Sequence, residues 1–217
     1  PEDSVLPSGV YAELRALSRA RVDCVEVLTA ARQRLEEADR AHHDAHTAKV
    51  LRKVHGEVVR ALEKQIAQLE KEMKKLIASD SQLSKDVELL DTIVGVGWYT
   101  AVSVIVELGD LRNFKRRSEV VAMAGLNPVV HSSGTSVEKR RRISKKGSSA
   151  ARRVLYLAAM STTTSKTSTG FKTMYEKLIG QGKAKKVALV AVMRKILLVM
   201  RAVVRSGKAF DPNFTKA

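Results

Sequence analysis

Cysteine and aromatic residues are scarce in this sequence, and each shortage excludes a class of protein. The single cysteine, Cys24, cannot form an internal disulfide or build a thiolate zinc site alone, which favours a reducing compartment. Aromatic residues make up 4% of the 217 residues, too few for a single-strand binder that relies on base stacking. The 44% of hydrophobic residues still supplies enough apolar side chains for one or two folded domains.

The sequence also lacks a targeting signal and a long uninterrupted apolar run. Residues 1–4 are acidic, and no apolar stretch of the signal-peptide type follows them. The most apolar segment, 187–204, contains Arg194, Lys195 and Arg201, which are costly at a bilayer centre. We therefore expect a buried helix with basic residues on one side, no membrane contact and a cytoplasmic location. Because the first residue is not methionine, we expect the chain to be a fragment.

Positive charge is abundant but confined to one part of the chain. The formal net charge is +16, and residues 1–90 carry 15 basic and 16 acidic side chains. Residues 91–217 carry 24 basic and 7 acidic side chains, so all of the excess lies there. This asymmetry predicts a polyanionic partner and an affinity that falls steeply with salt.

The first third of the sequence has the pattern of long helices. Between residues 10 and 78 there is almost no glycine or proline apart from Gly56, and apolar residues recur at helical spacing. One stripe suits a coiled coil, and a poorer stripe could be its antiparallel partner. The alternatives are a helical hairpin that packs on its own chain and a dimerisation element. The first stripe is Val58, Leu62, Ile66, Leu69, Met73 and Leu76; the second is Leu14, Leu17, Cys24, Leu28 and Leu35.

Two histidines, His42 and His46, lie at a spacing that places them on one helix face. No third ligand with suitable spacing is evident, so we predict a solvated helix–helix connection and no metal site.

The basic part opens with Gly95, Val96 and Gly97 between two helical patterns. Glycines allow a tight turn and close approach to a phosphate, and the N–H groups at the next helix start can donate to that phosphate. The pattern resembles a helix-hairpin-helix element, which binds nucleic-acid backbone, although tight helix–helix turns also use glycine.

A segment rich in proline, glycine and serine interrupts the helical pattern between residues 126 and 147. It predicts a short β-hairpin or loop beside a dense cluster of basic residues. Helices are expected around it: a short one before residue 125, then 148–159, 171–179 and 183–206. The fold class is therefore mainly α, with a coiled-coil or helical linker at 1–85 and a helical domain at 86–217.

Five ordered blocks within this second domain carry a family resemblance: residues 93–97, 124–128, 133–134, 143–147 and 152–159. They resemble the carboxy-terminal part of the "one-ten" family of insertion-sequence transposases, the group related to the Piv invertase. The resemblance spans 86–210, and the preceding helical region resembles that family's coiled-coil linker.

The resemblance implies a bacterial, nucleoid-associated DNA recombinase guided by a bridge RNA, with a metal-binding RuvC-like domain and a serine nucleophile. The four acids that would hold Mg²⁺ have no counterpart in this sequence, so we expect the chain alone to be inactive. Ser133 matches the family's nucleophile, with Ser132, Ser136 and Ser144 as lesser candidates; from composition alone, Ser132 and Ser133 could be turn residues.

Arginine and lysine side chains near this serine could stabilise the negative charge of a phosphoryl-transfer transition state and bind phosphate. A solvated cationic surface is the alternative interpretation. Three hypotheses remain at this point: a serine-dependent transposase portion, a non-catalytic nucleic-acid-binding module, and a dimerisation element. The predicted nucleic-acid-binding residues are Gly95, Val96, Gly97, Arg140, Arg141, Arg142, Lys145, Lys146, Arg152 and Arg153.

Overall fold

The computed structural model describes residues 9–40, 44–129, 142–165 and 169–211. Within them the chain forms eight helices and one two-stranded ladder, which confirms the mainly α fold class. The chain divides into two compact units, Pro1–Ser81 and Gln82–Ala217.

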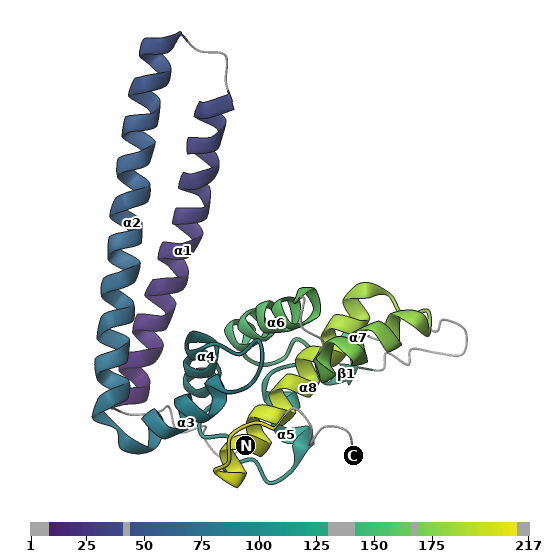
Figure 1. Ribbon diagram of the computed structural model, residues 1–217. Coiled ribbons are helices and arrows are strands. Elements are labelled where there is room, and N and C mark those ends of the chain that lie inside the picture. Colours follow the sequence, from purple (N-terminus) through teal and green to yellow (C-terminus); the bar gives the residue numbers. More distant parts are fainter. Residues whose placement is uncertain (1–8, 41–43, 130–141, 166–168, 212–217) are drawn as a thin grey trace. The chain divides into compact units, whose positions relative to one another are not determined.

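The first unit is a helical hairpin made of α1 (Val10–Arg40) and α2 (Ala45–Ser79), which lie side by side (Figure 1). Ion pairs join Arg21 to Glu70 and Arg32 to Glu63, so the two helices run antiparallel. Asp44 caps α2 by accepting hydrogen bonds from the His46 and Thr47 amides, at 3.0 Å each. The predicted polar connection therefore lies between two helices, and His42 falls outside the described residues.

Burial in the hairpin follows the predicted stripes only in part. Leu14, Leu28 and Met73 are buried, whereas the other stripe residues are half-buried or, like Val58, exposed. The remaining buried positions of α1 are the small residues Ser18, Ala31 and Ala38. Small side chains let two helices approach closely, and a search for large apolar residues overlooks them.

The second unit is built around α8 (Lys185–Ser206). This helix packs against α5 (Arg117–Met123), α6 (Ser149–Thr164) and α7 (Gly170–Gly180). In turn, α6 also packs against α4 (Trp98–Leu108), whose residues 101–106 are all buried. The predicted helices 148–159, 171–179 and 183–206 are thus confirmed, and α6 continues five residues further than expected, to Thr164.

Charged side chains tie loops of this unit to its helices. Asp86 of α3 (Ser81–Asp91) is buried and accepts a hydrogen bond from the Arg112 guanidinium, which raises the pKa of Arg112. Arg201 of α8 is 7% exposed and donates to the carbonyls of Phe114 and Lys115. Burial lowers the pKa of Arg201. The three basic residues of the apolar segment therefore differ in burial. Arg194 is exposed, Lys195 is half-buried, and Arg201 is buried.

The carboxy-terminal segment returns to the turn between α3 and α4. The Phe210 amide donates to the Thr92 hydroxyl at 2.9 Å, and the Phe210 ring stacks on Phe171 of α7. None of the helices in the described ranges combines the length and apolar character needed to cross a bilayer.

Candidate nucleic-acid interface

A two-stranded antiparallel ladder bounds the segment in which the sequence placed a nucleophile. Strand β1 (Pro128–Val129) pairs with β2 (Arg142–Ile143), with Pro128 opposite Ile143 and Val129 opposite Arg142. This pairing confirms the predicted hairpin at its base. Ser133, Arg140 and Arg141 lie outside the described residues, as do the lesser candidates Ser132 and Ser136.

Main-chain hydrogen bonds extend the ladder towards α5 and α6. The Ser144 amide donates to the Asn127 carbonyl at 2.9 Å, and the Lys145 amide donates to the Gly125 carbonyl at 3.1 Å. The Ser144 hydroxyl also donates to the Asn127 side-chain oxygen at 2.6 Å. This bond gives Ser144 a structural role and makes it a poorer candidate nucleophile than sequence alone indicated.

Two glycines allow the segments on either side of the ladder to touch. Gly125 has φ +67°, and a Cβ there would lie 2.8 Å from the Lys146 carbonyl oxygen. Gly147 has φ +126°, and a Cβ there would lie 2.1 Å from the Met123 carbonyl oxygen. A side chain at either position would force the two segments apart.

Three predicted contact residues lie together on the second of these segments, and all three are exposed: Arg142, Lys145 and Lys146. Lys145 has φ +55°, an uncommon conformation for a residue other than glycine, asparagine or aspartate. The ladder and the paired main chain hold this conformation, so the cations project from a well-fixed segment. Their exposure suits contact with a polyanion.

The neighbouring pair of arginines in α6 is divided between two roles. Arg153 is exposed, whereas Arg152 is half-buried and its Nη1 donates to the carbonyls of Ala124 and Gly147, each at 3.1 Å. Arg152 was predicted to contact phosphate, but two of its hydrogen bonds go to main-chain carbonyls of the protein itself.

The turn between α3 and α4 contains the other predicted contact residues. The Val96 amide donates to the Ile93 carbonyl at 2.8 Å, and Gly95 has φ +84°, as in a type II turn. A Cβ at Gly95 would lie 2.2 Å from Cγ2 of Thr162, so Gly95 is required for packing against α6. Val96 is buried, while Gly97 is the N-cap just before α4 and has open space where a side chain would be. Only Gly97 is thus suited to approach by a ligand.

Two polar residues join α4 to α6: Ser148, which the sequence offered with Ser149 as a helix cap, and Glu107, which sequence reasoning missed. The Ser148 hydroxyl donates to Glu107 Oε2 at 2.7 Å and accepts from the Ala151 amide at 3.1 Å. Ser148 had a recognisable signal, because serine is a preferred helix N-cap. Glu107 had none, since its partner lies 41 residues further along the chain.

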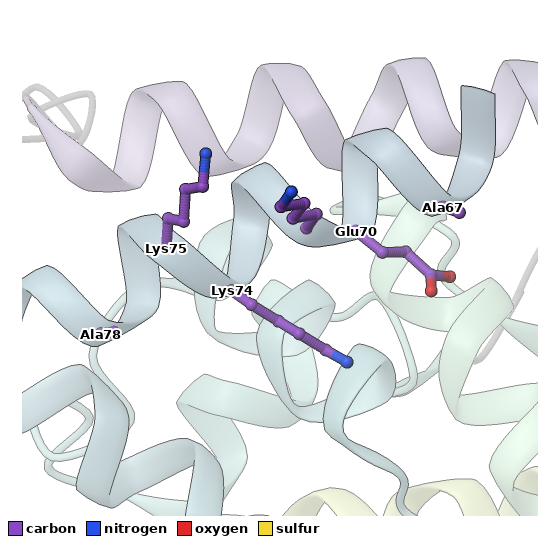
Figure 2. A pocket seen from close by; sticks show the side chains of 6 residues that line it. Ala67, Glu70, Lys74, Lys75 and Ala78 are labelled. Carbon is purple, nitrogen blue, oxygen red and sulfur yellow. The ribbon is translucent and has the colours of Figure 1, made fainter. Parts of the chain in front are cut away.

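A shallow hollow along α2 offers a second set of charges. Figure 2 shows Glu70 and Lys74 projecting from α2 among Ala67, Lys75 and Ala78. The Glu70 carboxylate accepts from Arg21 at 2.7 Å. The hollow also holds three lysines, Lys71, Lys74 and Lys75, beside this one carboxylate.

The carboxylates in the described ranges do not fit a divalent metal. No three histidine, cysteine, aspartate or glutamate side chains of this part of the chain converge on one point. The buried Asp86 is instead paired with Arg112. No chemical step is therefore assigned to a metal at these residues.

The family model "Transposase IS116/IS110/IS902 family" matches residues 87–176, which include the α3–α4 turn, the ladder and α6. The chain is 31% identical over 146 residues to the pilin gene-inverting protein of Moraxella bovis, covering 67% of this chain and 45% of that protein. It is 30% identical over 102 residues to the transposase for insertion sequence element IS1111A of Coxiella burnetii, covering 45% of this chain and 28% of that protein. The chain thus spans less than half the length of these relatives. It belongs to the IS116/IS110/IS902 family of transposases through the domain at residues 87–176.

Proposed function

We propose that this chain is the nucleic-acid-binding and serine-bearing portion of a DNA transposase or site-specific recombinase. The supporting observation is the ladder, which brackets residues 130–141 and carries the exposed cations Arg142, Lys145 and Lys146 beside it. The family model covers the ladder, and two relatives of the chain are named as a gene-inverting protein and a transposase.

The proposed reaction uses the hydroxyl of Ser133. As the hydroxyl loses its proton, its oxygen forms a bond to a DNA phosphorus, and one strand P–O bond breaks. The departing oxygen takes a proton. The nearby cations offset the negative charge that the phosphoryl group gains in the transition state. The resulting phosphoserine ester keeps the energy of the broken bond for rejoining.

The proposed partners are double-stranded DNA, contacted through its backbone, and a bridge RNA that supplies sequence specificity. Mg²⁺ is assigned to a RuvC-like domain outside these residues, because the described carboxylates do not fit it. A cytoplasmic, nucleoid-associated location follows from these partners. If the guide determines the target, no residue of this chain needs to recognise bases.

The proposal is tested in the protein at its full natural length, incubated with the bridge RNA, Mg²⁺, donor DNA and target DNA and then denatured. A covalent protein–DNA adduct is expected, and it should disappear in Ser133→Ala but persist in the matched control Ser132→Ala. An adduct that survives Ser133→Ala would remove this residue from the reaction. Salt-sensitive DNA binding with no adduct would favour the non-catalytic module.

A row of exposed valines on α2 favours self-association as a second function of the chain. Val50, Val54 and Val58 are 47%, 50% and 43% exposed and recur every four residues along one side of the helix. A second copy of the hairpin could cover them. Leu62, Ile66 and Leu69 of the predicted stripe are half-buried in the hairpin, so changing them would also destabilise it.

Replacing all three valines by serine should lower the mass measured by sedimentation while the helical signal is retained. Val27→Ser, at an exposed valine of α1, is the control and should leave the mass unchanged. An unaltered mass in the triple variant would contradict self-association through this row.

A further inference from the structure

Arg152 connects both segments that meet at the base of the ladder. Ala124, which accepts one hydrogen bond from Arg152, precedes β1, and Gly147, which accepts the other, follows β2. One guanidinium therefore links the outgoing and the returning chain. A planar guanidinium with several fixed donors suits such a double contact, whereas a lysine ammonium is a compact charge on a flexible stem.

The surrounding backbone is shaped to admit this side chain. A Cβ at Gly125 would lie 2.6 Å from Nη1 of Arg152, so the absence of a side chain there makes room for the guanidinium. The Lys145 and Ser148 amides donate to the Gly125 and Met123 carbonyls in the same layer. The contact is thus part of a continuous set of bonds across the ladder base.

The neighbouring Arg153 provides a built-in comparison. It has the same charge and lies in the same helix, but it is exposed, whereas Arg152 is half-buried. Consecutive helical residues point about 100° apart. If both arginines acted only through charge, replacing either would have similar effects on binding.

We propose that Arg152 is a positioning residue for strand exchange. By joining Ala124 to Gly147 it fixes where Val129 and Arg142 leave and rejoin the folded unit. Ser133 lies four residues beyond Val129 in the sequence, so the anchored strand is the last described part of the chain before it. The role in strand exchange rests on the proposed function of Ser133. The link that Arg152 makes between Ala124 and Gly147 does not depend on it.

Anchoring is tested on this chain by hydrogen exchange, with Arg152→Gln compared with Arg153→Gln. The amides of Ser144, Lys145 and Ser148 should exchange about tenfold faster in Arg152→Gln and at the original rate in Arg153→Gln. Amides of α8 should be unaffected in both, which shows that the unit stays folded. Equal protection of the three amides in both variants would overturn the anchoring.

The effect on the reaction is tested by the rate of Ser133 adduct formation in the full-length protein. At saturating DNA, Arg152→Gln should lower the rate constant about 10- to 100-fold, with Arg152→Lys intermediate. The half-saturating DNA concentration and its salt dependence should stay within about twofold. Arg153→Gln should act instead on the half-saturating concentration. A general loss of stability would lower the amount of adduct and leave the rate constant of the folded molecules unchanged.

The outcomes separate this inference from the function on which it rests. An unchanged rate constant in Arg152→Gln would overturn the positioning role. So would a weaker salt dependence of the half-saturating DNA concentration, because that is the result expected when a phosphate contact is lost. Absence of any adduct in the unsubstituted protein would refute the serine-dependent reaction. In that case the hydrogen-exchange result would still decide whether Arg152 anchors the ladder.

Discussion

The two units of this chain obtain their stability in different ways. Among the described residues, the hairpin buries 6 apolar side chains, whereas the second unit buries 32. Two helices alone can bury only one stripe each, and the remaining surface of the hairpin carries ion pairs and exposed valines. The second unit surrounds α8 on several sides. The comparison indicates that the second unit depends more on close packing of apolar side chains than the hairpin does.

The largest expected effect comes from opening a cavity in the packed unit. Leu155 of α6 is fully buried, and Leu155→Ala should lower the free energy of unfolding of that unit by about 3 kcal/mol. Leu157→Ala is the control, because Leu157 is 58% exposed on the same helix. Denaturation followed by the fluorescence of Trp98, the sole tryptophan, reports on this unit. A similar loss in both variants would contradict the close packing assigned to α6.

A second experiment separates the two glycines of the α3–α4 turn. Gly95→Ala should cost about 2 kcal/mol, since the new Cβ would meet Thr162 at a backbone conformation that disfavours side chains. Gly97→Ala should cost less, about 0.5 to 1 kcal/mol, because the space there is open and the only loss is that alanine is a poorer N-cap than glycine. Thermal unfolding of both variants provides the measurement. Equal losses would mean that the turn does not pack against α6 as described.

Smaller effects are expected for the ion pairs of the hairpin. The side chains of Arg21 and Glu70 are 20% and 28% exposed, whereas those of Arg32 and Glu63 are 58% and 46% exposed. Arg21→Met should therefore cost about 1 kcal/mol and Arg32→Met about 0.3 kcal/mol. Urea denaturation followed by circular dichroism, repeated at high salt, would measure both. Equal costs would show that burial does not distinguish the pairs.

The smallest effect concerns the cap of α2. Hydrogen bonds from Thr47 are the main cause that lowers the pKa of Asp44 below its ordinary 3.8. The lowered pKa means that the cap stabilises the helix above about pH 4 and loses this effect as the pH falls through the folded-state pKa. NMR of the Thr47 amide should follow this loss. In Asp44→Asn the cap persists without a titrating group, so the same pH dependence in that variant would contradict the assignment.

The sequence predicted elements with strong local signals better than contacts between distant residues. Helical periodicity located α1, α2 and α8, and a cluster of turn-forming residues located the ladder. The helical pattern up to residue 78 also agrees with the end of α2 at Ser79, but the sequence carried no separate signal for α3, because no glycine or proline directly precedes it.

The sequence predicted which segments form the candidate site, but it did not predict which residues within them contact one another. Charge and glycine spacing placed the turn and the basic segment in one domain. Arg152 donates to the Ala124 carbonyl, whereas Arg153 is exposed. The sequence could not predict this difference, because it arises from contact between residues 28 positions apart. The interpretation of Gly95 as a phosphate contact likewise overlooked its packing against Thr162.

The hydrogen bond between Phe210 and Thr92 joins two parts of the second unit that are 118 residues apart in the sequence. Removing the segment after α8 would therefore take a bonding partner from the turn after α3, and it would also take away the ring that stacks on Phe171 of α7. The stability of that turn thus depends on residues at the far end of the described chain.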